Sequence, residues 1–165
     1  MKRFIGTALV IYLAFILQTT IFQSLSLADV SPNILLIVTV SFAYIRENRD
    51  GIWIGFFSGL LMDAMYGEVL GLYALILMII GFVISIIPKD YFTDNIFVPM
   101  ILVGGSDFFY GFSYFVFEFL LRGRTSMIFY FSRIVLPEIV YTVIVSIVLY
   151  KLLYILDDRL EGKEV

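Results

Sequence analysis

The stretch FIGTALVIYLAFILQTTIF, residues 4–22, decides what kind of protein this chain is. It contains no charged residue, and about 20 mostly apolar residues in a helix cross the hydrocarbon core of a bilayer. Lys2 and Arg3 precede it, and residues 26–28 resemble a cleavage site, so a cleaved signal peptide is the alternative. A signal peptide has a shorter apolar region of about 7–15 residues. We therefore expect an uncleaved first transmembrane helix.

The composition of the whole chain agrees with a membrane location. Of its 165 residues, 61% are hydrophobic, and the mean hydropathy is +1.01. A soluble domain is nearer half apolar, and a chain this short could not bury so much apolar surface in a core of its own. The net charge of −3 leaves no basic surface for nucleic acid.

Five further apolar runs follow the first, separated by short polar breaks. Ser31-Pro32 is typical of a helix start, and Pro88 is typical of a helix end. The predicted fold is all-α, a polytopic bundle of six transmembrane helices over residues 1–155, followed by a short charged cytoplasmic tail at 156–165. The expected spans are about 4–22, 28–45, 51–66, 68–87, 96–117 and 128–150.

The distribution of Lys and Arg predicts the orientation of this bundle. With six spans and both termini in the cytoplasm, eight of the 11 basic residues lie on the cytoplasmic side. Arg122 and Arg124 lie outside, and Arg133 lies at the edge of the sixth span. Cytoplasmic loops of membrane proteins carry such an excess of positive charge. A five-span arrangement would place the charged C-terminal tail outside and weaken the asymmetry.

The chain lacks the residue types that most catalytic and metal sites use. It has no histidine and no cysteine, which removes thiolate nucleophiles, disulfides, and zinc or haem ligation through these residues. It also lacks a nucleophile elbow, a glycine-rich phosphate loop and a clustered acid motif. We therefore expect no catalytic residue, no cofactor and no metal.

Charged side chains inside the spans are costly in lipid, so each requires a partner or a function. The candidates are Asp63, Glu68, Asp107, Arg133 and Glu138. Asp107 is expected either to form hydrogen bonds to a neighbouring helix or to serve as a proton or ligand site. Arg133 is expected to contact an acid from spans three to five, or else to reach the outer lipid headgroups.

Glycines repeat every fourth residue in the third span and at the start of the fourth. They are Gly51, Gly55 and Gly59, then Gly67 and Gly71. Small residues at this spacing let helix backbones approach closely. We expect these two spans to pack against each other or against a partner helix.

Several short segments carry a family resemblance. They are residues 17–20, residues 31–36, residues 55–63 with Gly67 and Leu70-Gly71, and residues 136–138 with Tyr141, Thr142 and Tyr150. In these segments, and in its length and topology, the chain resembles the MreD family of bacterial rod shape-determining membrane proteins. Asp107 matches no motif of that family.

The resemblance implies a non-catalytic scaffold of the cell-wall elongation machinery in the bacterial cytoplasmic membrane. The implied partners are a single-span MreC-like protein, cytoplasmic MreB, RodZ, a penicillin-binding transpeptidase and a RodA-like glycosyltransferase. The residues expected to serve packing or partner binding are Gln18, Pro32, Asn33, Gly55, Gly59, Asp63, Gly71, Asp107, Arg133, Pro137 and Glu138.

The resemblance also implies a fold related to the substrate-binding subunits of energy-coupling-factor vitamin transporters, and such a subunit is the alternative function. A vitamin binder needs a pocket lined by several polar side chains and covered by a loop. The first outer loop, residues 23–30, is short and has one charge, Asp29. This favours the scaffold.

Overall fold

The computed structural model describes residues 2–22, 30–46, 49–67, 70–88, 97–117 and 127–161, and these residues form helices and no β-strand. The first helix, α1 (Lys2–Ile16), continues into a π-helical turn, η1 (Leu17–Ile21). The middle helices are α3 (Ile34–Ile45), α4 (Asp50–Tyr66), α5 (Leu72–Ile86) and α6 (Phe97–Phe115). The last helix has three consecutive parts: α7 (Met127–Tyr130), the π-helical η3 (Phe131–Val135) and α8 (Leu136–Glu161).

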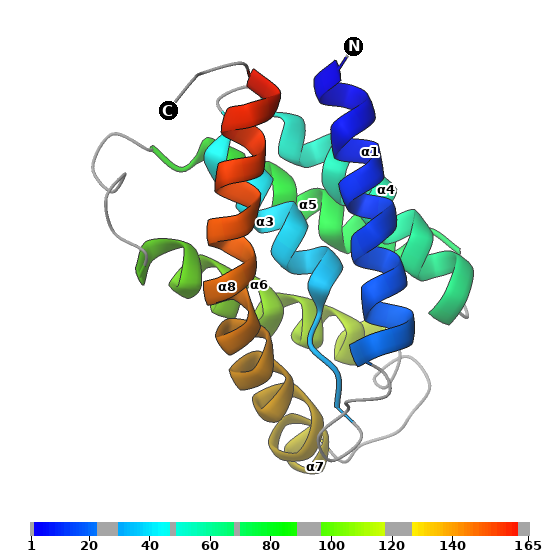
Figure 1. The fold of residues 1–165 in the computed structure, drawn as a ribbon. Helices are drawn as coiled ribbons and strands as arrows, with labels where there is room; N and C mark the ends of the chain where they lie inside the picture. Colours follow the sequence, from blue (N-terminus) through cyan, green and yellow to red (C-terminus); the bar gives the residue numbers. More distant parts are fainter. Residues whose placement is uncertain are drawn as a thin grey trace.

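Helix α3 forms the centre of the bundle. Each of its residues from Ile34 to Tyr44 is buried, and it contacts α1, α4, α5, α6 and α8 (Figure 1). A helix that is apolar on every side needs neighbours on every side. Its first residue is Ile34, six residues later than the expected span start, because Pro32 precedes the helix and Asn33 caps it. Residues 28 and 29 lie outside the described residues.

Helices α4 and α5 pack with their backbones in contact. A Cβ atom added to Gly55 would meet the Leu77 carbonyl oxygen, and one added to Gly59 would meet the Ala74 Cα. Gly51 and Gly81 approach each other in the same way near the other end of the pair. The glycine repeat in the third span predicted such an approach, and its partner is the neighbouring helix of the same chain. Gly71 does not take part, since a Cβ atom there would meet nothing within 4 Å.

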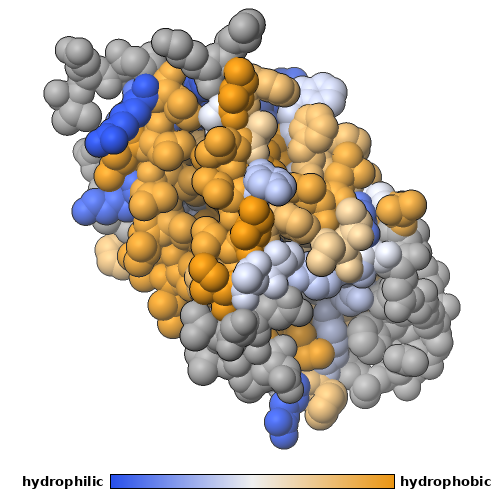
Figure 2. All heavy atoms as spheres, turned by 45° about the vertical axis from the view of Figure 1, so that its right-hand side comes forward, coloured by the Kyte–Doolittle hydropathy of each residue, from blue (hydrophilic) through white to orange (hydrophobic). Residues whose placement is uncertain are grey.

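The exposed surface of the bundle is largely apolar. Large hydrophobic side chains such as Leu9 on α1 and Val148 on α8 are more than half exposed, and hydrophobic residues dominate the face in Figure 2. Within the described residues, the segments Arg3–Ile21 and Ile128–Leu160 are long and apolar enough to cross a membrane. Helices α3 and α5 are also apolar but shorter. Such an outer surface requires lipid as its solvent.

The first and last helices are joined at one end of the bundle. The start of α1 and the end of α8 lie side by side (Figure 1), and Arg3 Nη2 lies 3.1 Å from Asp157 Oδ2. Helix α8 continues to Glu161, so residues 156–161, expected in a charged tail, are helical. Asp157 is only 2% exposed. It belongs to the bundle because its carboxylate neutralises arginines from other helices.

Candidate functional site

Five polar side chains from four parts of the chain come together where α3 begins. We call Gln18, Asn33, Asp107, Glu138 and Thr142 the polar cluster. They come from η1, the cap of α3, α6 and α8, and all except the half-buried Glu138 are at most 7% exposed. Four of the five lie in segments that carry the family resemblance, and Asp107 is the exception.

Gln18 and Asn33 satisfy the first backbone N–H groups of α3. The Leu35 N–H donates to Gln18 Oε1 at 3.0 Å, and the Leu36 N–H donates to Asn33 Oδ1 at 3.2 Å. The first turn of a helix has no intrahelical acceptors for these groups, and a lipid-surrounded interior offers no water in their place. Gln18 lies in the π-helical turn η1, a type of distortion common at functional positions. These two side chains therefore allow a helix to begin inside the bundle.

Thr142 connects this helix start to α8, and Asp107 lies beside it. The Asn33 N–H donates to Thr142 Oγ1 at 3.2 Å. The side chains of Asn33 and Thr142 neighbour the Asp107 carboxyl group, and Glu138 is near enough to interact with it. Neither oxygen of Asp107 nor Nδ2 of Asn33 reaches hydrogen-bond geometry with a described residue. The buried donor Asn33 Nδ2 and the buried acceptor oxygens of Asp107 thus lie in one region between α3, α6 and α8.

Pro137 lies two residues after the end of the π-helical turn in the last helix. The ring of a helical proline clashes with the carbonyl four residues earlier, and proline has no N–H to donate. In the wider turn η3, the Leu136 N–H donates to the Phe131 carbonyl, five residues back. This extra residue in the turn gives Pro137 room without breaking the helix.

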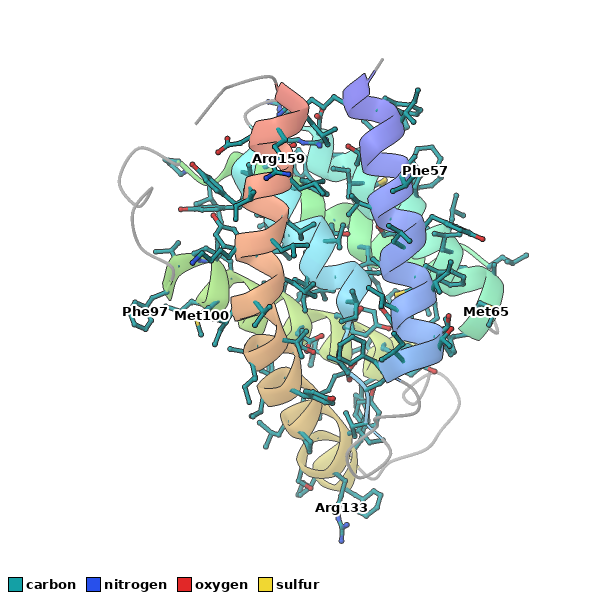
Figure 3. The ribbon with its side chains drawn as sticks, viewed as in Figure 1. Phe57, Met65, Phe97, Met100, Arg133 and Arg159 are labelled. Atoms are coloured by element: carbon teal, nitrogen blue, oxygen red, sulfur yellow. The ribbon has the colours of Figure 1, made fainter. Side chains whose placement is uncertain are left out.

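Arg133 points away from the bundle at the end opposite Arg3 (Figure 3). It is exposed, and its guanidinium carbon lies 5.9 Å from the centre of the Phe129 ring. The expected contact with Asp63 or Asp107 is wrong, since neither acid pairs with it in the described part of the chain. Glu68 lies outside the described residues. The 24 residues from Arg133 to Asp157 span about 36 Å. A hydrocarbon core is about 30 Å thick, so both charges can lie at its edges.

Asp63 serves the start of α5 instead. It is 2% exposed, and its two oxygens accept hydrogen bonds from the Tyr73 and Ala74 N–H groups, each at 3.0 Å. A carboxylate at a helix N-terminus satisfies unpaired donors and interacts favourably with the helix dipole. Gly71 precedes this helix with φ +97°, a backbone conformation that favours glycine. Asp63 and Gly71 therefore fix the turn between α4 and α5.

A second group of polar side chains joins the helices at the end of the bundle opposite the polar cluster. We call it the charged cluster, and it consists of Arg3, Thr7, Arg46, Asp50 and Asp157. Arg46 Nε and Nη2 donate to Asp157 Oδ1 at 3.0 and 2.8 Å, and Nη2 also donates to Thr7 Oγ1 at 2.8 Å. Its guanidinium carbon lies 4.4 Å from the centre of the Phe42 ring. From the sequence, Arg46 was expected only among the cytoplasmic basic residues, and Asp157 was expected in the tail.

One sequence signal could have located Asp157. From η3 onward, the buried positions of the last helix are spaced by four or seven residues, as on one face of a helix. They are Val135, Thr142, Ser146, Leu153 and Asp157. An aspartate that continues such a stripe faces the other helices.

Together these features define a helical membrane protein in which most of the described buried polar groups fasten one helix to another. A comparison with protein families finds that the model described as rod shape-determining protein MreD matches residues 2–159. The chain belongs to the MreD family and is a membrane protein with a role in determining rod shape. No curated protein and no solved structure matches it. The alternative of a transporter subunit has no support from these comparisons.

Proposed function

We propose that this protein is a non-catalytic scaffold of the cell-wall elongation machinery. In this proposal it binds a single-span MreC-like protein within the membrane and so links MreB filaments inside the cell to peptidoglycan synthases outside. RodZ, a penicillin-binding transpeptidase and a RodA-like glycosyltransferase belong to the same assembly. The proposed arrangement is six spans with both termini in the cytoplasm. The Lys and Arg distribution and the shared end of α1 and α8 support it.

One observation favours a scaffold function over a ligand-binding function. Three polar side chains in the family-like segments accept hydrogen bonds from backbone N–H groups at helix starts. Gln18 and Asn33 serve the start of α3, and Asp63 serves the start of α5. A ligand site needs polar side chains directed into a pocket. These side chains instead hold the relative positions of the helices, which is what a protein needs when its shape is recognised by a partner.

Co-purification in mild detergent tests the scaffold. The full chain with an affinity tag is expressed together with an MreC-like protein from the same bacterium, and an unrelated polytopic protein serves as the control. The expected result is that the MreC-like protein is recovered with this chain and not with the control protein. Failure to recover it from membranes that contain both proteins would overturn the proposal. A stoichiometric vitamin-like ligand in its place would favour the transporter subunit.

The absence of catalysis has its own test. Asp63→Asn and Glu138→Gln are expected to lower the amount of folded protein or its assembly with partners. If either change abolished a turnover reaction while protein level and partner binding were intact, the non-catalytic assignment would be wrong.

A further inference from the structure

A lateral groove of about 940 Å³ lies between α1 and α4. Its walls are apolar along most of their length, with Ala8 and Ile11 on one side and Ile54, Phe57 and Leu61 on the other. Phe57 lies next to α1 in Figure 3. The volume is within the range of about 300–1,000 Å³ for small-molecule sites. The groove is separate from the polar cluster, which lies near the opposite end of α3.

One end of the groove is charged. Arg3, Thr7, Arg46 and Asp50 line it there. Arg46 is buried and pairs with Asp157 and, at 3.5 Å, with Asp50, while Arg3 pairs with Asp157 at 3.1 Å. The side chains of Arg3 and Asp50 are 32% and 41% exposed. The mouth of the groove therefore presents one partly exposed cation and one partly exposed anion.

The length of the groove matches one leaflet. From Asp50 to Leu61 helix α4 rises about 16 Å, and half of a typical hydrocarbon core is about 15 Å. Trp53, 65% exposed, lies one turn from the charged end, at the depth where tryptophans of membrane proteins gather. The groove thus runs from the membrane surface to about the bilayer midplane. A transmembrane helix of a partner would need a groove about twice as long.

We propose that this groove binds one phospholipid with a zwitterionic phosphate–ammonium head group. The acyl chains lie along the apolar walls, the phosphate contacts Arg3, and the ammonium contacts Asp50. An arginine and a carboxylate exposed together complement a phosphate and an ammonium on one head group. The exposed carboxylate of Asp50, although it lies 3.5 Å from Arg46 Nη1, has no favourable contact to make with a head group that carries only a negative charge. With the orientation given under Proposed function, the lipid comes from the cytoplasmic leaflet.

Native mass spectrometry of the full-length protein tests this. Delipidated protein in detergent is titrated with phosphatidylethanolamine or with phosphatidylglycerol of the same acyl chains. The expected result is one retained phosphatidylethanolamine per chain, with weaker retention of phosphatidylglycerol. Ala8→Trp fills the groove and is expected to abolish retention. Ile144→Trp places a tryptophan on the exposed face of α8 and is expected to leave retention unchanged.

Two further variants test the head-group contacts. Arg3→Gln is expected to weaken retention of both lipids about two- to fivefold, the size of an exposed charge contact. Asp50→Asn is expected to remove the preference for phosphatidylethanolamine. Equal retention by the Ala8→Trp and Ile144→Trp proteins would overturn the site. A preference for phosphatidylglycerol in the wild type would overturn the head-group assignment. If Ala8→Trp abolished recovery of the MreC-like protein and the wild type retained no lipid, the groove would be a helix site.

Discussion

Asp157→Asn is predicted to destabilise the bundle far more than Asp158→Asn, one position further along α8. Asp157 is 2% exposed and accepts from Arg46 at 3.0 and 2.8 Å and from Arg3 at 3.1 Å. Asp158 is half-buried and forms no ion pair within the described residues. The two substitutions are chemically the same, so the difference in stability between the two variants measures the contribution of the contacts that Asp157 makes.

The size of the effect follows from what the substitution leaves behind. Removing one partner of a buried ion pair leaves the other charge without compensation and costs about 3–5 kcal/mol. In a chain of this length about 1 kcal/mol lowers Tm by about 2–4 °C. The expected loss is therefore roughly 6–20 °C for Asp157→Asn. Asp158→Asn is expected to cost less than about 0.5 kcal/mol, as for an ordinary surface change.

Thermal unfolding in mild detergent, followed by circular dichroism, measures both variants. The combined change Arg46→Gln with Asp157→Asn adds a coupling measurement. Since each single change already breaks the pair, the double variant should be more stable than the sum of the two losses predicts, by about 0.5–3 kcal/mol. Equal Tm values for the Asp157 and Asp158 variants, or strict additivity in the double variant, would refute the structural role of this pair.

Three further predictions concern topology, glycine packing and helix capping. Reporter fusions at Val165 and in residues 121–125 should report opposite sides of the membrane, and a common side would contradict six spans. Gly55→Leu should abolish accumulation of folded protein because its side chain would strike the α5 backbone, whereas Gly105→Leu, which has open space, should accumulate normally by size-exclusion chromatography. Asp63→Ala should cost about 1–2 kcal/mol in detergent unfolding through the lost cap of α5, and a wild-type Tm would contradict that role.

Local features of the sequence predicted the parts of the fold that depend on near neighbours. The glycine repeat at Gly55 and Gly59 needs only positions close in the chain to be understood, whereas the cap predicted at Ser31 was wrong, since Asn33 caps the helix. The expectations of no thiolate nucleophile, no disulfide and no metal site of histidine or cysteine also needed no structure, because the chain lacks both residue types. Helix α3 begins at Ile34, later than the expected span start, because the capping residue lies after Pro32.

The polar contacts between distant segments were predicted poorly. Arg133 was expected either to contact an acid or to reach the outer lipid headgroups, and it lies exposed at the edge of the bundle. Asp63, its expected partner, caps α5. Periodicity gives the face on which a side chain lies, but the depth of that residue depends on the length and tilt of the whole helix. The sixth helix extends beyond its apolar run, and this moved both Arg133 and Asp157 relative to the expected membrane edge.

The sequence by itself determined that this chain is helical, that it belongs in a membrane and that it resembles the MreD family. These properties follow from composition, run length and short motifs, since lipid tolerates only structures with internally satisfied backbones. Only the tertiary structure decided that Gln18, Asn33 and Thr142 meet at the start of a buried helix, and that Arg46 pairs with Asp157 at the other end. Such pairings join residues 17 to 111 positions apart. They depend on how helices pack around α3, and nothing in one linear sequence states which helices become neighbours.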